Sequence, residues 1–291
     1  MLNNYGEVIK DASLLSYNTY GINTSCKYLV KPHNIDKLKE LFVYLSSNNL
    51  KYYILGKGSN VILPDNKFDG VIISLEKIND FNISDNYVCA SAGIILSSLV
   101  MECINNNLAG LECLASIPGT LGGALVGNAG ANGQTIYDHV TEVEVLRNNE
   151  IITLKKVDID VSYRHTIFKE NNDIILSATF QLNKGNKETM QNIVKENRIK
   201  RINSQPLEYK NAGSVFRNPE GDYAGRLIEE LGLKGFCVND AEVSMKHANF
   251  IVNKGNATGE DIRKLIKIIK DKVKEKYNID LVLEQIIVDW D

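Results

Sequence analysis

The stretch IPGTLGGALVGNAGANG (residues 117–133) contains six glycines, although the whole chain of 291 residues has only 21. No charged side chain interrupts it. Glycine loses much backbone entropy in an ordered segment, so such a cluster is favoured where the chain needs a positive φ or brings its amides against a ligand. Pro118 stiffens the entrance, and apolar residues would anchor the stretch in a core, namely Ile117, Leu121, Leu125 and Val126. We predict a structured ligand-binding loop, with a flexible linker as the alternative.

The composition indicates a globular protein of two or three subdomains, because 32.5 kDa is too much for one core. A net charge of −3 argues against a nucleic-acid partner. Five scattered cysteines with largely apolar neighbours predict reduced, buried thiols, and no metal site is expected. The N-terminus lacks a long apolar region, and no window reaches eighteen consecutive apolar residues. These features predict a cytoplasmic protein that neither enters nor crosses a membrane.

A second glycine motif, GKGSN (residues 56–60), lies between two short apolar runs at 52–55 and 61–63. A dinucleotide-binding Rossmann turn would lead into a helix, whereas this turn joins two strands. If it binds a phosphate, the ligands are its successive amides and the side chains of Ser59 and Asn60. A plain hairpin turn is an equally good interpretation of the motif alone.

Periodicity predicts an α+β protein whose last third forms a separate unit. Helices are expected at 35–48, 96–106, 187–203, 223–231 and 262–277. Strands are expected at 71–73, 87–93, 140–147, 151–154, 173–182, 248–252 and 281–288.

Four polar patches could carry chemistry. Arg164, in SYRHT (162–166), could offer a planar charged fork to a carboxylate, or make a surface ion pair. Ser214 follows a glycine in NAGSVFRNP (211–219), without the elbow or triad of a hydrolase. The basic groups of LKG (233–235) and KHAN (246–249) could hold a phosphate, although a lone histidine such as His247 is more often structural.

The fourth patch is Glu284, in the run LVLEQIIV (281–288). Strand alternation places it on the face of Val282 and Ile286. A carboxylate on an apolar face should be either paired or functional.

In this order the patches resemble the UDP-N-acetylenolpyruvoylglucosamine reductase (UDP-N-acetylmuramate dehydrogenase) family over nearly the entire chain. The matching segments are 17–22, 55–60, 117–133, 163–164, 205–207, 212–219, 227–235 and 246–253. The chain has no long insertion between its second and third units. In this it resembles the shorter class of the family, which lacks a substrate-gripping tyrosine loop. The resemblance implies an α+β fold: an FAD-binding unit of the vanillyl-alcohol-oxidase (PCMH) type with subdomains 1–75 and 76–195, and a C-terminal α+β substrate-binding domain, 196–291.

The resemblance also implies a reaction. NADPH passes hydride to FAD N5, which passes it to C3 of the enolpyruvyl group of UDP-N-acetylglucosamine enolpyruvate. Ser214 protonates C2, and Arg164 and Glu284 stabilise the enolate. Glu284 would need a raised pKa if it acts as an acid, which an apolar strand would favour. The product, UDP-N-acetylmuramate, serves peptidoglycan synthesis.

The family's other site residues carry over by position. Implied FAD-binding residues are Gly56, Lys57, Gly58, Ser59, Asn60, Val61, Gly93, Ile117, Pro118, Gly119, Gly122, Gly123, Asn128 and Gly130. Implied substrate-binding residues are Tyr163, Asn218, Lys234 and His247. The expected partners are the sugar nucleotide and NADPH, and the expected state is a monomer or weak oligomer.

The chain departs from the family pattern at several positions. Gln285 and Ile286 follow Glu284 where the family usually has valine and arginine, so a cation near the acid is missing. Asn239 and Asp240 replace two common glycines, while Gly127 and Asn132 replace a usual methionine and a usual aromatic residue. The alternative functions are another FAD-dependent oxidoreductase of the same fold, such as an alcohol or sugar oxidase, and a non-catalytic FAD- or nucleotide-binding module.

Overall fold

The computed structural model describes residues 2–290, which form two compact units. The first unit comprises residues 2–9, 28–56 and 70–200. The second comprises residues 10–27, 57–69 and 201–290. Each unit is therefore assembled from three separate stretches of chain. The three-part division with boundaries at 75 and 195 stays a prediction.

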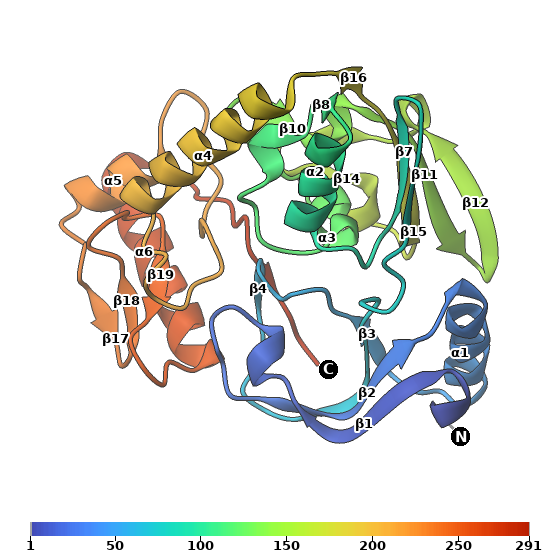
Figure 1. The fold of residues 1–291 in the computed structure, drawn as a ribbon. Coiled ribbons are helices and arrows are strands. Elements are labelled where there is room, and N and C mark those ends of the chain that lie inside the picture. Colours follow the sequence, from blue (N-terminus) through green and yellow to red (C-terminus); the bar gives the residue numbers. More distant parts are fainter. Residues whose placement is uncertain (1, 291) are drawn as a thin grey trace. The chain divides into compact units, whose positions relative to one another are not determined.

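The centre of the first unit is an antiparallel sheet with strand order β12-β11-β15-β7-β6. Its strands are β6 (Phe81–Ser84), β7 (Tyr87–Ser91), β11 (Val140–Arg147), β12 (Glu150–Lys155) and β15 (Ile174–Gln181). In register, Val143 pairs with Ala178 of β15 and with Leu154 of β12. Two helices, α2 (Leu96–Asn105) and α3 (Leu121–Val126), share a buried apolar core with this sheet (Figure 1).

A second core in this unit surrounds α1 (Ile35–Ser47). Its buried residues Leu38, Leu41 and Leu45 recur at helical spacing, and Asn34 caps its first turn by accepting a hydrogen bond from Lys37 N. They pack with Val71 and Ile73. The neighbouring sheet has the order β1-β2-β5-β3, formed by β1 (Gly6–Ser13), β2 (Ser25–Pro32), β3 (Tyr52–Ile54) and β5 (Phe68–Ile73).

The second unit contains a three-stranded sheet with two helices, α5 (Ala224–Glu230) and α6 (Gly259–Tyr277). Its strands are β17 (Cys237–Val238), β18 (Ala241–Val243) and β19 (Ile251–Asn253). Thr258 and Asp261 form a capping box at the start of α6. Helix α4 (Lys187–Ser204) precedes this region.

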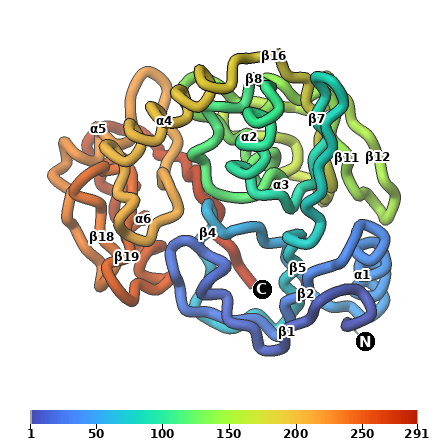
Figure 2. Tube along the Cα trace, viewed as in Figure 1, coloured from blue at the N-terminus to red at the C-terminus, as the bar shows by residue number. Residues whose placement is uncertain are grey.

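Short two-stranded pairs complete the fold. Strand β4 (Val61–Ile62) runs parallel to β20 (Ile286–Ile287), so that the segment after GKGSN lies along the C-terminal segment (Figure 2). The other pairs are β8 (Leu108–Ala109) with β16 (Asn183–Lys184), β9 (Gly130–Ala131) with β10 (Gln134–Thr135), and β13 (Val161–Ser162) with β14 (His165–Thr166).

The predicted α+β class is confirmed, and the helices α1, α2, α4, α5 and α6 lie within a few residues of their predicted bounds. Three predictions were wrong. The run 281–288 is a strand only at its residues 286–287, and the strand predicted at 248–252 begins at Ile251. Cys89 and Cys237 are exposed rather than buried. Strands β1 and β2 and helix α3 had no counterpart among the predicted elements.

None of the helices within residues 2–290 combines the length and apolar character needed to cross a bilayer.

Candidate active site

The glycine-rich run forms α3 and packs against the segment that follows β7. Leu121 N donates to Ile94 O (2.9 Å), and Gly122 N donates to Ala92 O (2.8 Å). A Cβ on Gly122 would lie 3.0 Å from the Ala92 Cβ, and Gly119 has a φ of +127°. The run is therefore structured, as predicted, and at least two of its glycines are required by the backbone itself.

Two other glycines of the predicted cofactor set also lie at close approaches in this unit. A Cβ on Gly56 would lie 2.8 Å from Thr120 Oγ1, the atom that caps α3 by accepting from Gly123 N. A Cβ on Gly93 would lie 1.8 Å from Leu75 O. A larger residue would displace the Thr120 side chain at position 56 and the main chain at position 93, so these glycines shape the surroundings of α3.

The remaining residues of GKGSN belong to the second unit, where Gly58 packs on the YNTYGI segment (17–22). Gly58 has a φ of +60°, and a Cβ there would lie 2.1 Å from Tyr17 O. Its carbonyl accepts from Thr19 N (3.1 Å) and Thr19 Oγ1 (3.3 Å). Buried Asn18 closes the neighbouring turn by bonding Leu14 O and both backbone groups of Ile22. The GKGSN turn and the YNTYGI segment are therefore packed together in the second unit.

Gly58→Ala is expected to lower the free energy of unfolding by about 2–4 kcal/mol, because it adds positive-φ strain to a clash with the main chain. Gly221→Ala is the matched control, since Gly221 has a φ of +74° and a Cβ added there would meet no atom within 4 Å. Gly221→Ala should lower the free energy of unfolding by only about 1 kcal/mol. Urea unfolding of both variants checks this, and equal losses would show that the contact with Tyr17 is unimportant.

Arg164 lies against the end of the glycine-rich run. Its Nη2 donates to Gly130 O (2.7 Å) and its Nη1 to Asn128 O (3.4 Å). Its own backbone has a φ of +56°, and Lys169 Nζ donates to its carbonyl (2.8 Å). Tyr163 is 57% exposed, with its ring centre 5.3 Å from Arg164 Cζ. The guanidinium is thus held beside residues 128–130 by main-chain oxygens.

Within the second unit, main-chain pairing brings the segments of Ser214 and Glu284 together. Glu284 N donates to Val215 O (2.9 Å). Asn60 Nδ2 donates to Glu284 O (3.1 Å), and Ile286 N donates to Asn60 O (2.9 Å). One end of the GKGSN turn, the serine segment and the acidic residue are therefore neighbours.

Strand alternation predicted an apolar face around Glu284, and this prediction was wrong. Val282 is 55% exposed and Ile286 is 37% exposed, so these residues do not surround the carboxylate with a buried apolar surface. Between Val282 and Ile286, the buried residue is Gln285, at 3% exposure. The alternation predicts a regular strand, whereas pairing with distant segments sets the orientation here.

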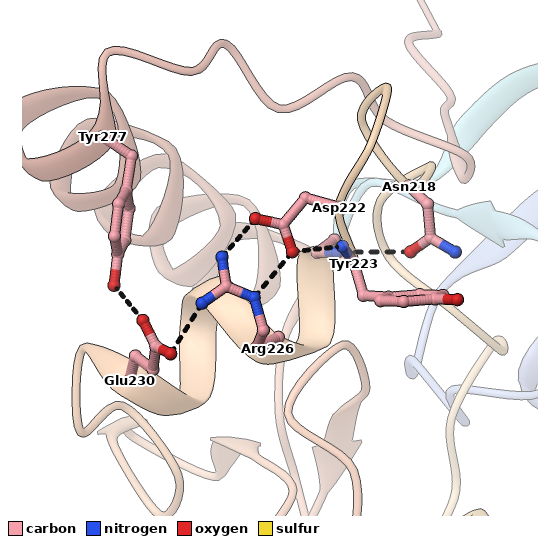
Figure 3. A network of polar contacts seen from close by, with 7 residues as sticks. Asn218, Asp222, Tyr223, Arg226, Glu230 and Tyr277 are labelled. Atoms are coloured by element: carbon pink, nitrogen blue, oxygen red, sulfur yellow. Dashed lines mark hydrogen bonds and ion pairs between the residues drawn. The ribbon is translucent and has the colours of Figure 1, made fainter.

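Asn218 holds the start of α5, because its Oδ1 accepts from Ala224 N (3.2 Å) (Figure 3). Beside it, Arg226 bonds Asp222 and donates to Glu230 Oε1 (2.6 Å). The guanidinium lowers the pKa of Asp222 to about 2. This exposed network keeps its charges paired along the helix.

Lys234 and His247 both lie in the second unit. Lys234 Nζ donates to Glu229 Oε1 (2.6 Å). His247 Nδ1 accepts from Asn249 N (3.2 Å), and burial, aided by the charge of Lys234, lowers the pKa of His247. The ring is therefore neutral at pH 7, with its proton on Nε2, and can donate to an anionic oxygen.

Each unit thus gathers its own part of the predicted site. The first holds Arg164, Tyr163 and the glycine-rich run, and the second holds Ser214, Glu284, Asn218, Lys234 and His247. Sequence reasoning missed three buried amides that organise these segments, Asn18, Asn249 and Gln285. A signal existed for Asn249, which lies in the otherwise apolar sequence ANFIV.

The first unit offers an acceptor suited to a polar ligand. Asn128 is 4% exposed, and its Nδ2 donates to Ser162 O (2.8 Å). Its Oδ1 is buried and has no hydrogen-bond partner within residues 2–290. Such a group is costly unless a ligand or water supplies a donor. It lies where the glycine-rich run meets Arg164, so these residues fit the polar edge of a flavin.

Comparison with known proteins first identifies the class of protein. A family model of the FAD binding domain matches residues 26–154, so the chain is an FAD-binding oxidoreductase. A second family model, described as UDP-N-acetylenolpyruvoylglucosamine reductase, C-terminal domain, matches residues 205–288.

The particular family follows from full-length relatives. The UDP-N-acetylenolpyruvoylglucosamine reductase of Clostridium novyi is 40% identical over 97% of this chain and 92% of that protein. That of Caldicellulosiruptor saccharolyticus is 41% identical over 94% and 89%. The crystal structure of the Thermus caldophilus enzyme aligns with a TM-score of 0.81 at 30% identity, covering 97% of this chain and 98% of that one. The chain belongs to the UDP-N-acetylenolpyruvoylglucosamine reductase family.

Proposed function

We propose that this protein reduces UDP-N-acetylglucosamine enolpyruvate to UDP-N-acetylmuramate in the cytoplasm, with bound FAD and with NADPH as hydride donor, and acts as a monomer or weak oligomer. The observation that carries the proposal is the pairing of the Ser214 and Glu284 segments, through Glu284 N and Val215 O, in the region matched by the reductase C-terminal domain. A sugar or alcohol oxidase would not require this pair.

When bound, FAD supplies hydride transfer from NADPH to C3 of the enolpyruvyl ether. The residues proposed to hold its diphosphate are those of the GKGSN turn, whose fold depends on Gly58. The residues proposed to hold its ring system are Gly123 and Asn128, whose buried Oδ1 accepts no hydrogen bond within residues 2–290.

The proposed roles of the chain's own residues follow from charge development in the substrate. Hydride addition at C3 places negative charge on C2 and its carboxylate, and the guanidinium of Arg164 stabilises that charge. The hydroxyl of Ser214 then delivers a proton to C2, completing addition across the double bond. Glu284 polarises the same intermediate from the paired segment.

The substrate's anionic groups need donors in the second unit. His247, neutral with its proton on Nε2, and the Lys234 ammonium suit a diphosphate or carboxylate. The Oδ1 of Asn218 already accepts from Ala224 N, so its Nδ2 is the group proposed to donate to the substrate. Exposed Tyr163 is placed beside Arg164 and completes the proposed substrate set.

Anaerobic titration of the purified holoprotein tests the function. We expect NADPH to bleach the flavin absorbance, and the enolpyruvyl nucleotide alone to restore it with formation of UDP-N-acetylmuramate. Bleaching by an alcohol or sugar with no response to NADPH would instead identify the oxidase alternative. A protein that binds FAD and responds to none of these reagents would be a non-catalytic module.

A further inference from the structure

Gln285 is a buried polar residue directly after the proposed acid Glu284. Its side chain makes three hydrogen bonds to segments far away in the sequence. Nε2 donates to Ala212 O and to Gly213 O, both at 3.1 Å. Oε1 accepts from the hydroxyl of Tyr20 (3.0 Å). All four residues belong to the second unit.

The orientation of this amide follows from its partners. Main-chain carbonyls only accept, so Nε2 must face Ala212 and Gly213, and Oε1 must face the hydroxyl. Tyr20 is fully buried, and burial raises its pKa, so it remains a phenol that donates. Asn253 Nδ2 donates to the Tyr20 carbonyl (2.8 Å), which fixes the tyrosine from its main chain as well.

The carbonyls that Gln285 binds directly precede Ser214. Gly213 has a φ of +79°, and a Cβ added there would meet no atom within 4 Å, so packing does not restrain this residue. On the other side, Val215 N donates to Asn249 O and Val215 O accepts from Glu284 N, both at 2.9 Å. Ser214 is therefore restrained on both sides: on its N-terminal side Gln285 binds the two carbonyls, and Asn211 Oδ1 accepts from Gly213 N (3.0 Å).

We propose that Gln285 is a positioning residue for Ser214: by binding Ala212 O and Gly213 O, it sets the place from which the serine hydroxyl delivers its proton. The proposal rests on the proposed function. An apolar side chain at this position would have no donor for these carbonyls, so the connection from Tyr20 through residue 285 to the serine turn depends on this glutamine.

The test uses the holoenzyme and separates its two half-reactions. Gln285→Leu should leave FAD binding and bleaching by NADPH unchanged, because these steps precede proton delivery. Recovery with the enolpyruvyl nucleotide should slow by about 10²-fold, the cost expected of a displaced reacting group. Tyr20→Phe is a milder variant that keeps the bonds of Nε2 to both carbonyls, and it should slow the same step less.

A double-mutant cycle identifies the route of the effect. On a Ser214→Ala background, Gln285→Leu should add almost no further loss, because the group that it positions is already absent. Without turnover, amide hydrogen exchange of residues 211–216 should be faster in Gln285→Leu than in the wild type.

Three outcomes would overturn the inference. They are a wild-type recovery rate in Gln285→Leu, equal loss of both half-reactions, and full additivity with Ser214→Ala. Failure of the wild-type holoenzyme to recover with the nucleotide would instead reject the proposed function itself.

Discussion

Ser214→Ala is expected to slow reduction of the enolpyruvyl nucleotide by about 10²- to 10⁴-fold, the range over which a positioned general acid contributes. The variant keeps the backbone bonds that surround the serine, since Val215 N and O make them. FAD content and bleaching by NADPH should therefore remain those of the wild type. Stopped-flow absorbance of the flavin measures the two half-reactions separately.

The control for this variant is Ser98→Ala, which removes a hydroxyl from an exposed position of α2 in the other unit. It should match the wild type in both half-reactions. If Ser214→Ala also recovers at the wild-type rate, the serine is not the proton donor, although the family assignment would stand.

Arg164→Met is expected to give the second-largest effect, a loss of about 10²- to 10³-fold in reduction of the substrate, as for removal of a group that stabilises a developing oxyanion. The methionine removes the charge and the bonds to Gly130 O and Asn128 O. Arg164→Lys should reduce the substrate at a rate between those of the wild type and Arg164→Met, because it keeps the charge but loses the planar fork. Single-turnover rates at saturating nucleotide measure this.

Arg147→Met is the matched control for the arginine. Arg147 bonds both oxygens of Asp173 (2.8 and 2.7 Å) in the same unit, and the Asp173 side chain is only 3% exposed. Loss of the arginine removes the cation from this carboxylate, so it should lower stability and leave the half-reactions intact. An Arg164→Met enzyme with normal substrate reduction and weakened FAD binding would assign the guanidinium to the cofactor instead.

The elements that sequence reasoning predicted well have local causes. Helix α1 is specified by the spacing of Leu38, Leu41 and Leu45 and by the cap at Asn34, all within a dozen residues. Strand β11 has its predicted bounds, and its antiparallel partner β12 follows after only two residues. Such local signals predict the structure correctly because the apolar face that they define is the face that the folded protein buries.

The C-terminal run 281–288 was predicted poorly for the opposite reason. Its partners are Asn60 and Val61 on one side and Val215 on the other, so distant segments decide its pairing and its exposed face. The apolar alternation favoured Val282 and Ile286 as the inner residues. Tertiary pairing buried Gln285 instead, because its amide could bond two carbonyls and a phenol that would otherwise be unsatisfied.

By itself, the sequence determined the α+β class, the ordered glycine-rich run, and a family resemblance that marked Arg164, Ser214 and Glu284. Those features depend on residue types at short spacing. Only the tertiary structure decided that Arg164 lies against residues 128–130, that Gly58 packs on Tyr17, and that Gln285 links Tyr20 to the serine turn. The physical reason is separation along the chain: Gln285 is 265 residues from Tyr20 and 73 from Ala212. No local periodicity encodes a hydrogen bond across such distances.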